Sequence, residues 1–179
     1  MNTDDYIKTG RLTAVISFAL GTLLFISYYL TSAGSLLFMG YGYIAMAGVI
    51  NLVLLLIILV RAITDKENRK KLLITSGLML GNIPVMLVYC WFAIVLLNTM
   101  RITFINRTEA RLTDINIVGC GGGHIGQLEK SESETVWVAI KGDCGIFIDY
   151  STDGKHKKED VTGYVTTGMG GKMTYIIDK

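Results

Sequence analysis

The sequence predicts a membrane α + all-β protein, in which three transmembrane helices precede a small extracytoplasmic β-sandwich of the immunoglobulin-like or open-barrel type. Only 18% of the 179 residues are charged, below the roughly 25% that is usual in soluble domains, and the mean hydropathy is +0.46. The charges are also absent from two long stretches in the first 100 residues, whereas residues 101–179 contain short alternating apolar runs. The uncharged stretches predict the helices, and the alternating runs predict the β domain.

The two uncharged stretches comprise 49 residues between Arg11 and Arg61 and 29 residues between Lys71 and Arg101. A helix needs about 20 apolar residues to cross the ~30 Å hydrocarbon core of a bilayer. The first stretch is therefore long enough for two crossings and the second for one. Within a membrane domain of residues 1–100, we place the helices at about 12–31, 43–60 and 72–98, with an uncharged turn at 32–42.

The basic residues predict the orientation of these helices. Five lie in the loop from Arg61 to Lys71, two lie in the N-terminal tail, and none lies in the turn after the first helix. Because short basic loops stay in the cytoplasm, we expect a cytoplasmic N-terminus and a periplasmic C-terminal domain at a bacterial inner (plasma) membrane. The alternative for the first segment is a signal peptide cleaved near Ala33, and the basic loop predicts the same location for the C-terminal domain in that case.

Residues 101–179 have the composition of a small β domain. They hold 10 Lys and Arg against 11 Asp and Glu, so no nucleic-acid-binding face is expected. Apolar residues alternate with polar ones, as at Ile146, Ile148 and Tyr150, and turn sequences such as "TDGK" at 152–155 separate these runs. Period-two patterns of this kind indicate strands with one buried face. We expect six or seven strands and no helix.

The segment "IVGCGGGHIGQ" at 117–127 contains the G-x-G-x-x-G spacing of dinucleotide-binding sites. That motif works by opening a helix whose N-terminus holds the pyrophosphate, but only eight residues, most of them polar, separate Gly126 from the next predicted strand at Thr135. We therefore interpret 119–134 as a long loop between two strands. Because exposed loops on a rigid sheet often carry function, it is the candidate partner-binding loop, with Gly121, Gly122, Gly123, His124, Glu132 and Glu134 as its candidate residues.

Two cysteines and two histidines of this domain could have a chemical role. Cys120, His124, Cys144 and His156 are residue types that bind zinc, but their spacing matches no standard zinc motif. A Cys120–Cys144 disulfide suits an exported domain. If the strands on either side of the 119–134 loop were neighbours, however, the two thiols would lie roughly 20 Å apart at opposite ends of the sheet, beyond disulfide range. The pairing stays open, and no metal or cofactor is expected.

The apolar segments contain Asn51 and Asn82, which we expect to form hydrogen bonds between the second and third helices or with a neighbouring protomer. They contain no Asp, Glu, Lys, Arg or His, which argues against a transporter. No hydrolytic motif such as G-x-S-x-G is present either. The sequence therefore favours a protein without catalytic activity.

These features predict an integral membrane protein that presents a periplasmic β domain to another protein. The most specific hypothesis is a bacterial immunity protein, which neutralises a toxin that acts in the periplasm or on the membrane. The alternative is an accessory subunit of a multiprotein inner-membrane complex. In both cases the expected partners are membrane lipid and a second protein, a homo-oligomer is compatible with the sequence, and nucleic acid is not expected.

Overall fold

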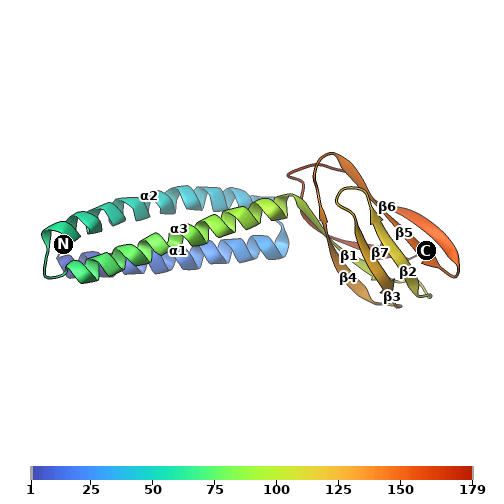
Figure 1. Cartoon of the computed structure of the whole chain (residues 1–179), viewed down its shortest axis with the longest axis horizontal. Coiled ribbons are helices and arrows are strands. Elements are labelled where there is room, and N and C mark those ends of the chain that lie inside the picture. Colours follow the sequence, from blue (N-terminus) through green and yellow to red (C-terminus); the bar gives the residue numbers. More distant parts are fainter. Residues whose placement is uncertain (1, 179) are drawn as a thin grey trace. The chain divides into compact units, whose positions relative to one another are not determined.

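The computed structural model describes residues 2–178, and the chain divides into two compact units, Met1–Ala93 and Ile94–Lys179. Three helices come first along the chain, followed by seven strands (Figure 1). The helices are α1 (Thr3–Thr31), α2 (Gly34–Thr64) and α3 (Arg69–Leu97). This arrangement of apolar helices followed by a β domain agrees with the sequence-based expectation.

Each of the three helices is long and apolar enough to cross a membrane, judged by its length and composition. They contain 29, 31 and 29 residues, and at 1.5 Å per residue they extend about 44–47 Å. The expected turn at 32–42 is wrong, because α2 already begins at Gly34. Ser32 has a left-handed φ of 55°, and the chain reverses its direction over the two residues Ser32 and Ala33. The glycines that follow were mistaken for turn residues.

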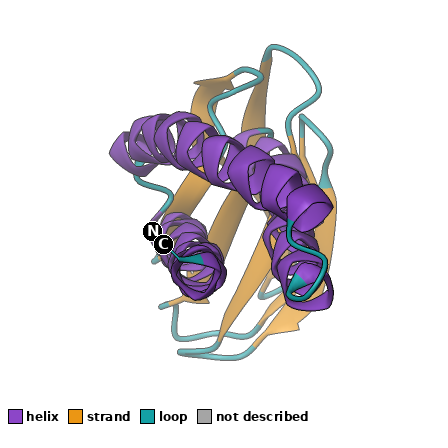
Figure 2. Ribbon diagram, turned by 90° about the vertical axis from the view of Figure 1, so that its left-hand side faces the viewer, coloured by secondary structure: helices purple, strands orange, loops and turns teal. Residues whose placement is uncertain are grey.

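Gly10 of α1 lies against both other helices. A Cβ atom at this position would lie 2.5 Å from Cδ1 of Ile58 in α2 and 2.9 Å from Cγ2 of Thr75 in α3. The missing side chain therefore lets α1 contact both other helices at once. Fully buried Leu72 belongs to the same apolar cluster. Figure 2 looks at this unit from the end where the chain begins and shows α2 running across the other two helices.

Both asparagines of the helices bond to α1. Asn51 in α2 donates from Nδ2 to Oγ of Ser17 at 2.8 Å, and Asn82 in α3 donates from Nδ2 to the carbonyl oxygen of Ala14 at 2.9 Å. The expectation that these amides would join α2 to α3 is therefore wrong. Because α1 packs against both helices at Gly10, its polar atoms are the ones within reach of each amide.

The second unit contains two sheets. The strands are β1 (Thr99–Asn106), β2 (Leu112–Val118), β3 (Gly123–Leu128), β4 (Ser133–Ala139), β5 (Cys144–Thr152), β6 (Lys155–Val165) and β7 (Gly171–Ile177). Their orders are β4-β1-β7 and β3-β2-β5-β6. All neighbours are antiparallel except β1 and β7. In an immunoglobulin domain strands 1, 2, 5 and 4 share one sheet and 3, 6 and 7 share the other, so the strand order here differs from that of an immunoglobulin domain.

One apolar core lies between the two sheets, and the alternating runs supply most of it. Phe104 of β1, Ile117 of β2 and Ile148 of β5 all belong to this core, as the period-two pattern predicts. Tyr150 is the largest of its fully buried side chains. The expected number of strands is confirmed, although two of the seven, β3 and β6, lay outside the clear alternating runs.

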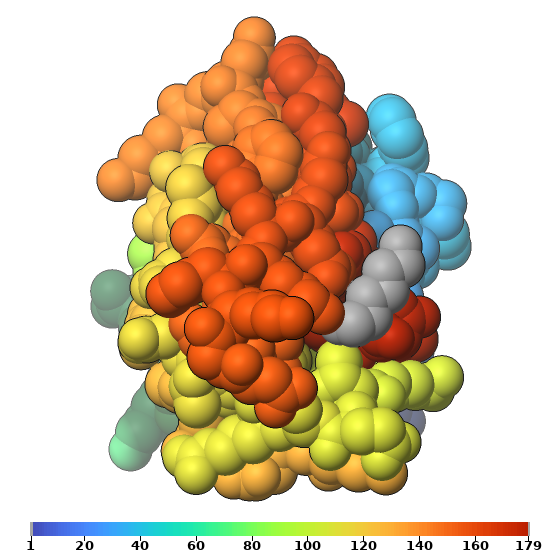
Figure 3. All heavy atoms as spheres, turned by 90° about the vertical axis from the view of Figure 1, so that its right-hand side faces the viewer, coloured from blue at the N-terminus to red at the C-terminus, as the bar shows by residue number. Residues whose placement is uncertain are grey.

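The last turn of α3 belongs to the β unit and marks one of its two ends. The backbone N–H of Ile140 donates to the carbonyl oxygen of Asn98 at 2.8 Å, and that of Gly170 donates to Leu97 at 2.7 Å. We call this the helix-side end. At the opposite end, the far end, lie the segment before β2 and the β5–β6 hairpin, which Figure 3 shows at the front in yellow-green and orange-red.

Candidate partner-binding surface

The segment at 119–134 is not one long loop, because β3 occupies its middle. β3 pairs antiparallel with β2, with Gly123 opposite Ile117 and Leu128 opposite Leu112. Ile125 and Leu128 fill the core, with exposed fractions of 1% and 0%, and they are three residues apart instead of two. Because this spacing breaks the period-two pattern, the strand was not recognised in the sequence.

The six candidate residues of the predicted loop do not form one surface. Gly121 and Gly122 lie in the β2–β3 turn at the helix-side end, whereas Gly123 and His124 begin β3. Glu132 precedes β4 and Glu134 lies within it, at the far end. β3, which is about 20 Å long, runs from the first group to the far end. The expectation of a single glycine-rich and acidic recognition loop is therefore wrong.

The glycines of the β2–β3 turn allow close backbone contacts. Gly119 has a φ of 93°, and a Cβ atom there would lie 2.0 Å from the carbonyl oxygen of Gly145. A Cβ atom at Gly121 would lie 2.8 Å from the carbonyl oxygen of Ala139. The chain then enters β3 directly, so the G-x-G-x-x-G spacing opens a strand and provides no helix N-terminus for a pyrophosphate.

Cys120 and Cys144 form a disulfide, with their Cα atoms 5.3 Å apart. The objection to this pairing assumed that the strands flanking 119–134 are neighbours. Instead β2 pairs antiparallel with β5, with Val118 opposite Phe147, so the end of β2 lies beside the start of β5. Both thiols are used in the disulfide, so neither is available as a zinc ligand in this structure.

The outer face of the β4-β1-β7 sheet carries an exposed aromatic residue, Trp137, beside Arg101. Since Met100, Ile102 and Phe104 face the core, the residues between them face outward. The register places their neighbours on β4 and β7 in three rows across the sheet: Trp137–Arg101–Lys172, Thr135–Thr103–Thr174 and Ser133–Ile105–Ile176. We call these nine residues the outer face.

Trp137 and Arg101 support one another on the outer face. The Cζ atom of Arg101 lies 5.6 Å from the centre of the Trp137 ring, within the range of a cation–π contact. Arg101 is 5% exposed and Trp137 is 43% exposed. In the next row the Thr103 and Thr135 hydroxyls are hydrogen bonded at 2.8 Å. A charged residue between the apolar Met100 and Ile102 was the sequence signal that could have identified this face.

A carboxylate held by two tyrosines connects the two sheets. Glu159 of β6 accepts a hydrogen bond from the Tyr150 hydroxyl of β5 at 2.6 Å and one from the Tyr175 hydroxyl of β7 at 2.8 Å. Burial, and then the bond to Glu159, raises the pKa of Tyr175 to about 12, and the same causes raise the pKa of Tyr150. Both hydroxyls therefore stay protonated at neutral pH and donate. The three residues come from different strands, so no local sequence pattern indicates the cluster.

No known protein-family model matches the sequence, and no curated protein matches it. Among solved structures, the chain is similar to the NMR structure of a protein from Eubacterium rectale. The identity is 16%, the match covers 45% of this chain and 78% of that one, and the TM-score is 0.37. At this level the similarity supports no conclusion about function.

Proposed function

We propose that the three helices span a bacterial inner membrane and that the β unit lies in the periplasm, where its outer face binds another protein. The proposal assigns no catalytic step to the chain. The position of Trp137 is the main support for a binding function. This large aromatic side chain is half-exposed on a regular sheet and contacts the buried Arg101.

Two independent features support this location. The disulfide between Cys120 and Cys144 lies in the β unit, and disulfides persist in the periplasm but are rare in the cytosol. The loop between α2 and α3 is rich in Lys and Arg, and such loops stay in the cytoplasm. Because α3 alone separates the basic loop from the β unit, the two features predict opposite sides of one membrane.

The chemistry of the outer face favours a protein partner. Trp and Arg are the residue types that dominate binding energy in protein interfaces, and a side chain that is already ordered loses little entropy on binding. Lys172 adds a second positive charge to the row of Arg101 and Trp137. We expect a partner with an acidic group opposite Lys172 and an apolar pocket for the indole ring of Trp137.

Two kinds of partner fit this proposal. In the first, the partner is a toxin that acts in the periplasm or on the inner membrane, and the chain is its immunity protein. In the second, the chain is an accessory subunit of a membrane complex. The second is favoured by Gly40, Gly42 and Gly48 of α2, where a Cβ atom would meet nothing within 4 Å, because small residues let membrane helices approach closely.

A photo-crosslinking residue at Thr174 tests this proposal in intact cells. Thr174 is exposed and lies in the middle row of the outer face. We expect one discrete crosslinked protein from this position and none from Lys158, an exposed residue of β6 in the other sheet. Mass spectrometry of the product then shows whether it is a toxin or a subunit of a membrane complex.

Trp137→Ala should remove most of this crosslinked product. Loss of a hot-spot tryptophan from an interface costs about 2 kcal/mol or more, which is roughly a 30-fold loss of affinity. The matched control is Tyr164→Ala, since Tyr164 is an exposed aromatic residue of β6 with an exposed fraction of 56%. Wild-type crosslinking by the Trp137 variant, or equal losses in both variants, would exclude the outer face as the binding surface.

A further inference from the structure

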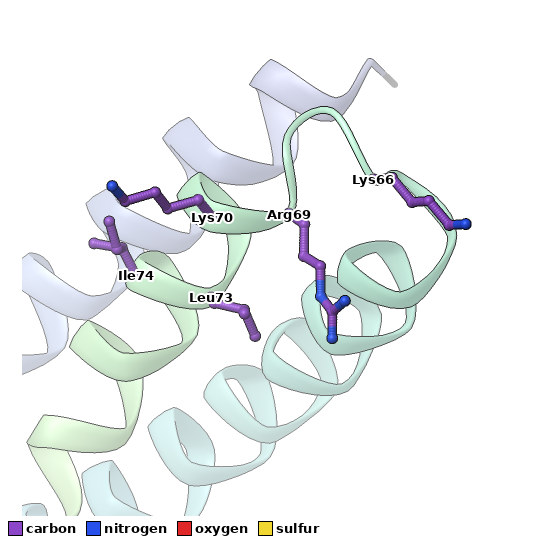
Figure 4. Close-up of a pocket in the computed structure, with 5 residues that line it drawn as sticks. All are labelled: Lys66, Arg69, Lys70, Leu73 and Ile74. Atoms are coloured by element: carbon purple, nitrogen blue, oxygen red, sulfur yellow. The ribbon is translucent and has the colours of Figure 1, made fainter.

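A groove beside the α2–α3 connection is not explained by the proposed function. It has a volume of about 510 Å³ and is lined by Lys66, Arg69, Lys70, Leu73 and Ile74 (Figure 4). The side chains of Arg69 and Leu73 extend from α3 toward α2, whereas Lys70 and Ile74 extend from the other side of α3 and Lys66 points outward from the connection. The groove therefore combines three positive charges with two apolar side chains.

The positive charges of the groove have no protein partner. Within residues 2–178, Lys66, Arg69 and Lys70 take part in no ion pair and in no side-chain hydrogen bond. Other basic residues near this end of the helices are engaged. Arg61 lies 5.3 Å from the ring centre of Tyr6, and Arg11 donates to Thr75.

The acidic residues of the connection do not neutralise the groove. Asp65 accepts hydrogen bonds from the Thr3 hydroxyl at 2.7 Å and from the Asn68 amide. The bond from Thr3, followed by those from Asn68, lowers the pKa of Asp65, so its charge is used to hold α1 and the loop. Residues 65–71 contain four basic and two acidic side chains, which leaves a net positive charge.

The apolar side chains lie deeper along α3 than the basic ones. Leu73 and Ile74 follow Arg69 by four and five residues, so they begin about 6 Å further along the helix axis. They are 47% and 55% exposed. A soluble anion would contact only the basic part of the groove, whereas an amphiphile can contact both parts.

We propose that this groove binds an anionic phospholipid, with the phosphate against Arg69, flanked by Lys66 and Lys70, and the start of an acyl chain along Leu73. This inference rests on the proposed membrane placement, which puts the groove in the cytoplasmic leaflet. Anionic lipids are enriched on that side, and basic pockets beside membrane helices bind their headgroups. The bound lipid would fill the space that α2 and α3 leave beside their connection.

Native mass spectrometry of the full chain in mild detergent tests the groove. The probes are phosphatidylglycerol, phosphatidylcholine and inorganic phosphate. We expect the wild-type chain to retain phosphatidylglycerol at least fivefold better than phosphatidylcholine. The variant Arg69→Gln with Lys70→Gln should lose this preference. The control variant Lys8→Gln with Lys71→Gln removes the same charge from nearby positions outside the groove lining and should keep it.

Two results would overturn the lipid site. Equal loss of preference in both variants would mean that only the general positive charge attracts the lipid. Displacement of phosphatidylglycerol by an equal concentration of inorganic phosphate would mean that Leu73 contributes nothing. Membranes washed with alkali report separately on the placement. A chain retained there without any lipid preference overturns the groove alone, whereas a chain that is washed out overturns the membrane proposal as well.

Discussion

Gly119→Ala should destabilise the β unit by about 3 kcal/mol. Gly119 has a φ of 93°, and a Cβ atom would lie 2.0 Å from the carbonyl oxygen of Gly145. A left-handed conformation costs a residue with a side chain about 1–2 kcal/mol, and relief of an overpacked contact typically costs another 1–3 kcal/mol. Because the Gly145 oxygen belongs to the backbone and an alanine methyl group has no alternative rotamer, no side-chain rotation can relieve the contact. We therefore expect β2 and β5 to separate at this end.

Urea unfolding followed by tryptophan fluorescence measures this effect in the full-length chain. The chain has two tryptophans, Trp91 and Trp137. In a Trp91→Phe background the fluorescence therefore comes from Trp137 and reports on unfolding of the β unit. The matched control is Gly142→Ala, because a Cβ atom at Gly142 would meet nothing within 4 Å. Equal unfolding midpoints for the Gly119 and Gly142 variants would contradict the close approach of the β2–β3 turn to β5.

Replacing both Cys120 and Cys144 by serine should cost roughly 3–4 kcal/mol. The disulfide joins positions separated by 24 residues in sequence, and the loss of loop-closure entropy on unfolding predicts this magnitude. Small domains have a total stability of about 5–15 kcal/mol, so the variant should unfold at a much lower urea concentration. Addition of a thiol reductant should lower the midpoint of the wild type to the same value.

Cys90→Ser is the control for the disulfide, since Cys90 of α3 is a free cysteine. It should keep the wild-type midpoint and the wild-type response to reductant. The double serine variant should not respond to reductant at all. A wild-type midpoint that reductant leaves unchanged would show that the Cys120–Cys144 bond does not stabilise the β unit.

Features with a strong local signal were predicted from the sequence. Stretches without charge predicted three apolar helices, and regular alternation predicted strands such as β5, in which Ile146, Ile148 and Tyr150 are all fully buried. The start of α2 was missed because Gly34, Gly40 and Gly42 are typical of turns in soluble proteins. β6 was missed because its first residues are mostly charged, although the Asp153–Gly154 pair before it is a typical hairpin turn.

Features that depend on strand order were not predictable from one sequence. Whether Cys120 and Cys144 meet depends on the pairing of β2 with β5, and no short-range pattern encodes that choice. The outer face likewise combines residues from β1, β4 and β7, which become neighbours only in the sheet. The sequence identified Cys120 and Cys144 as candidate partners, but the distance argument used the wrong pair of neighbouring strands.

The central proposal places the β unit across the membrane from the α2–α3 connection, and a pair of reporter fusions tests it most directly. A phosphatase that folds only in the periplasm is fused after Lys179 in one variant and inserted beside Glu67 in another. Because the loop is basic and the disulfide lies in the β unit, we expect activity from the Lys179 fusion and none from the Glu67 insertion. Activity at Glu67 together with silence at Lys179 would contradict the orientation and, with it, the periplasmic binding function.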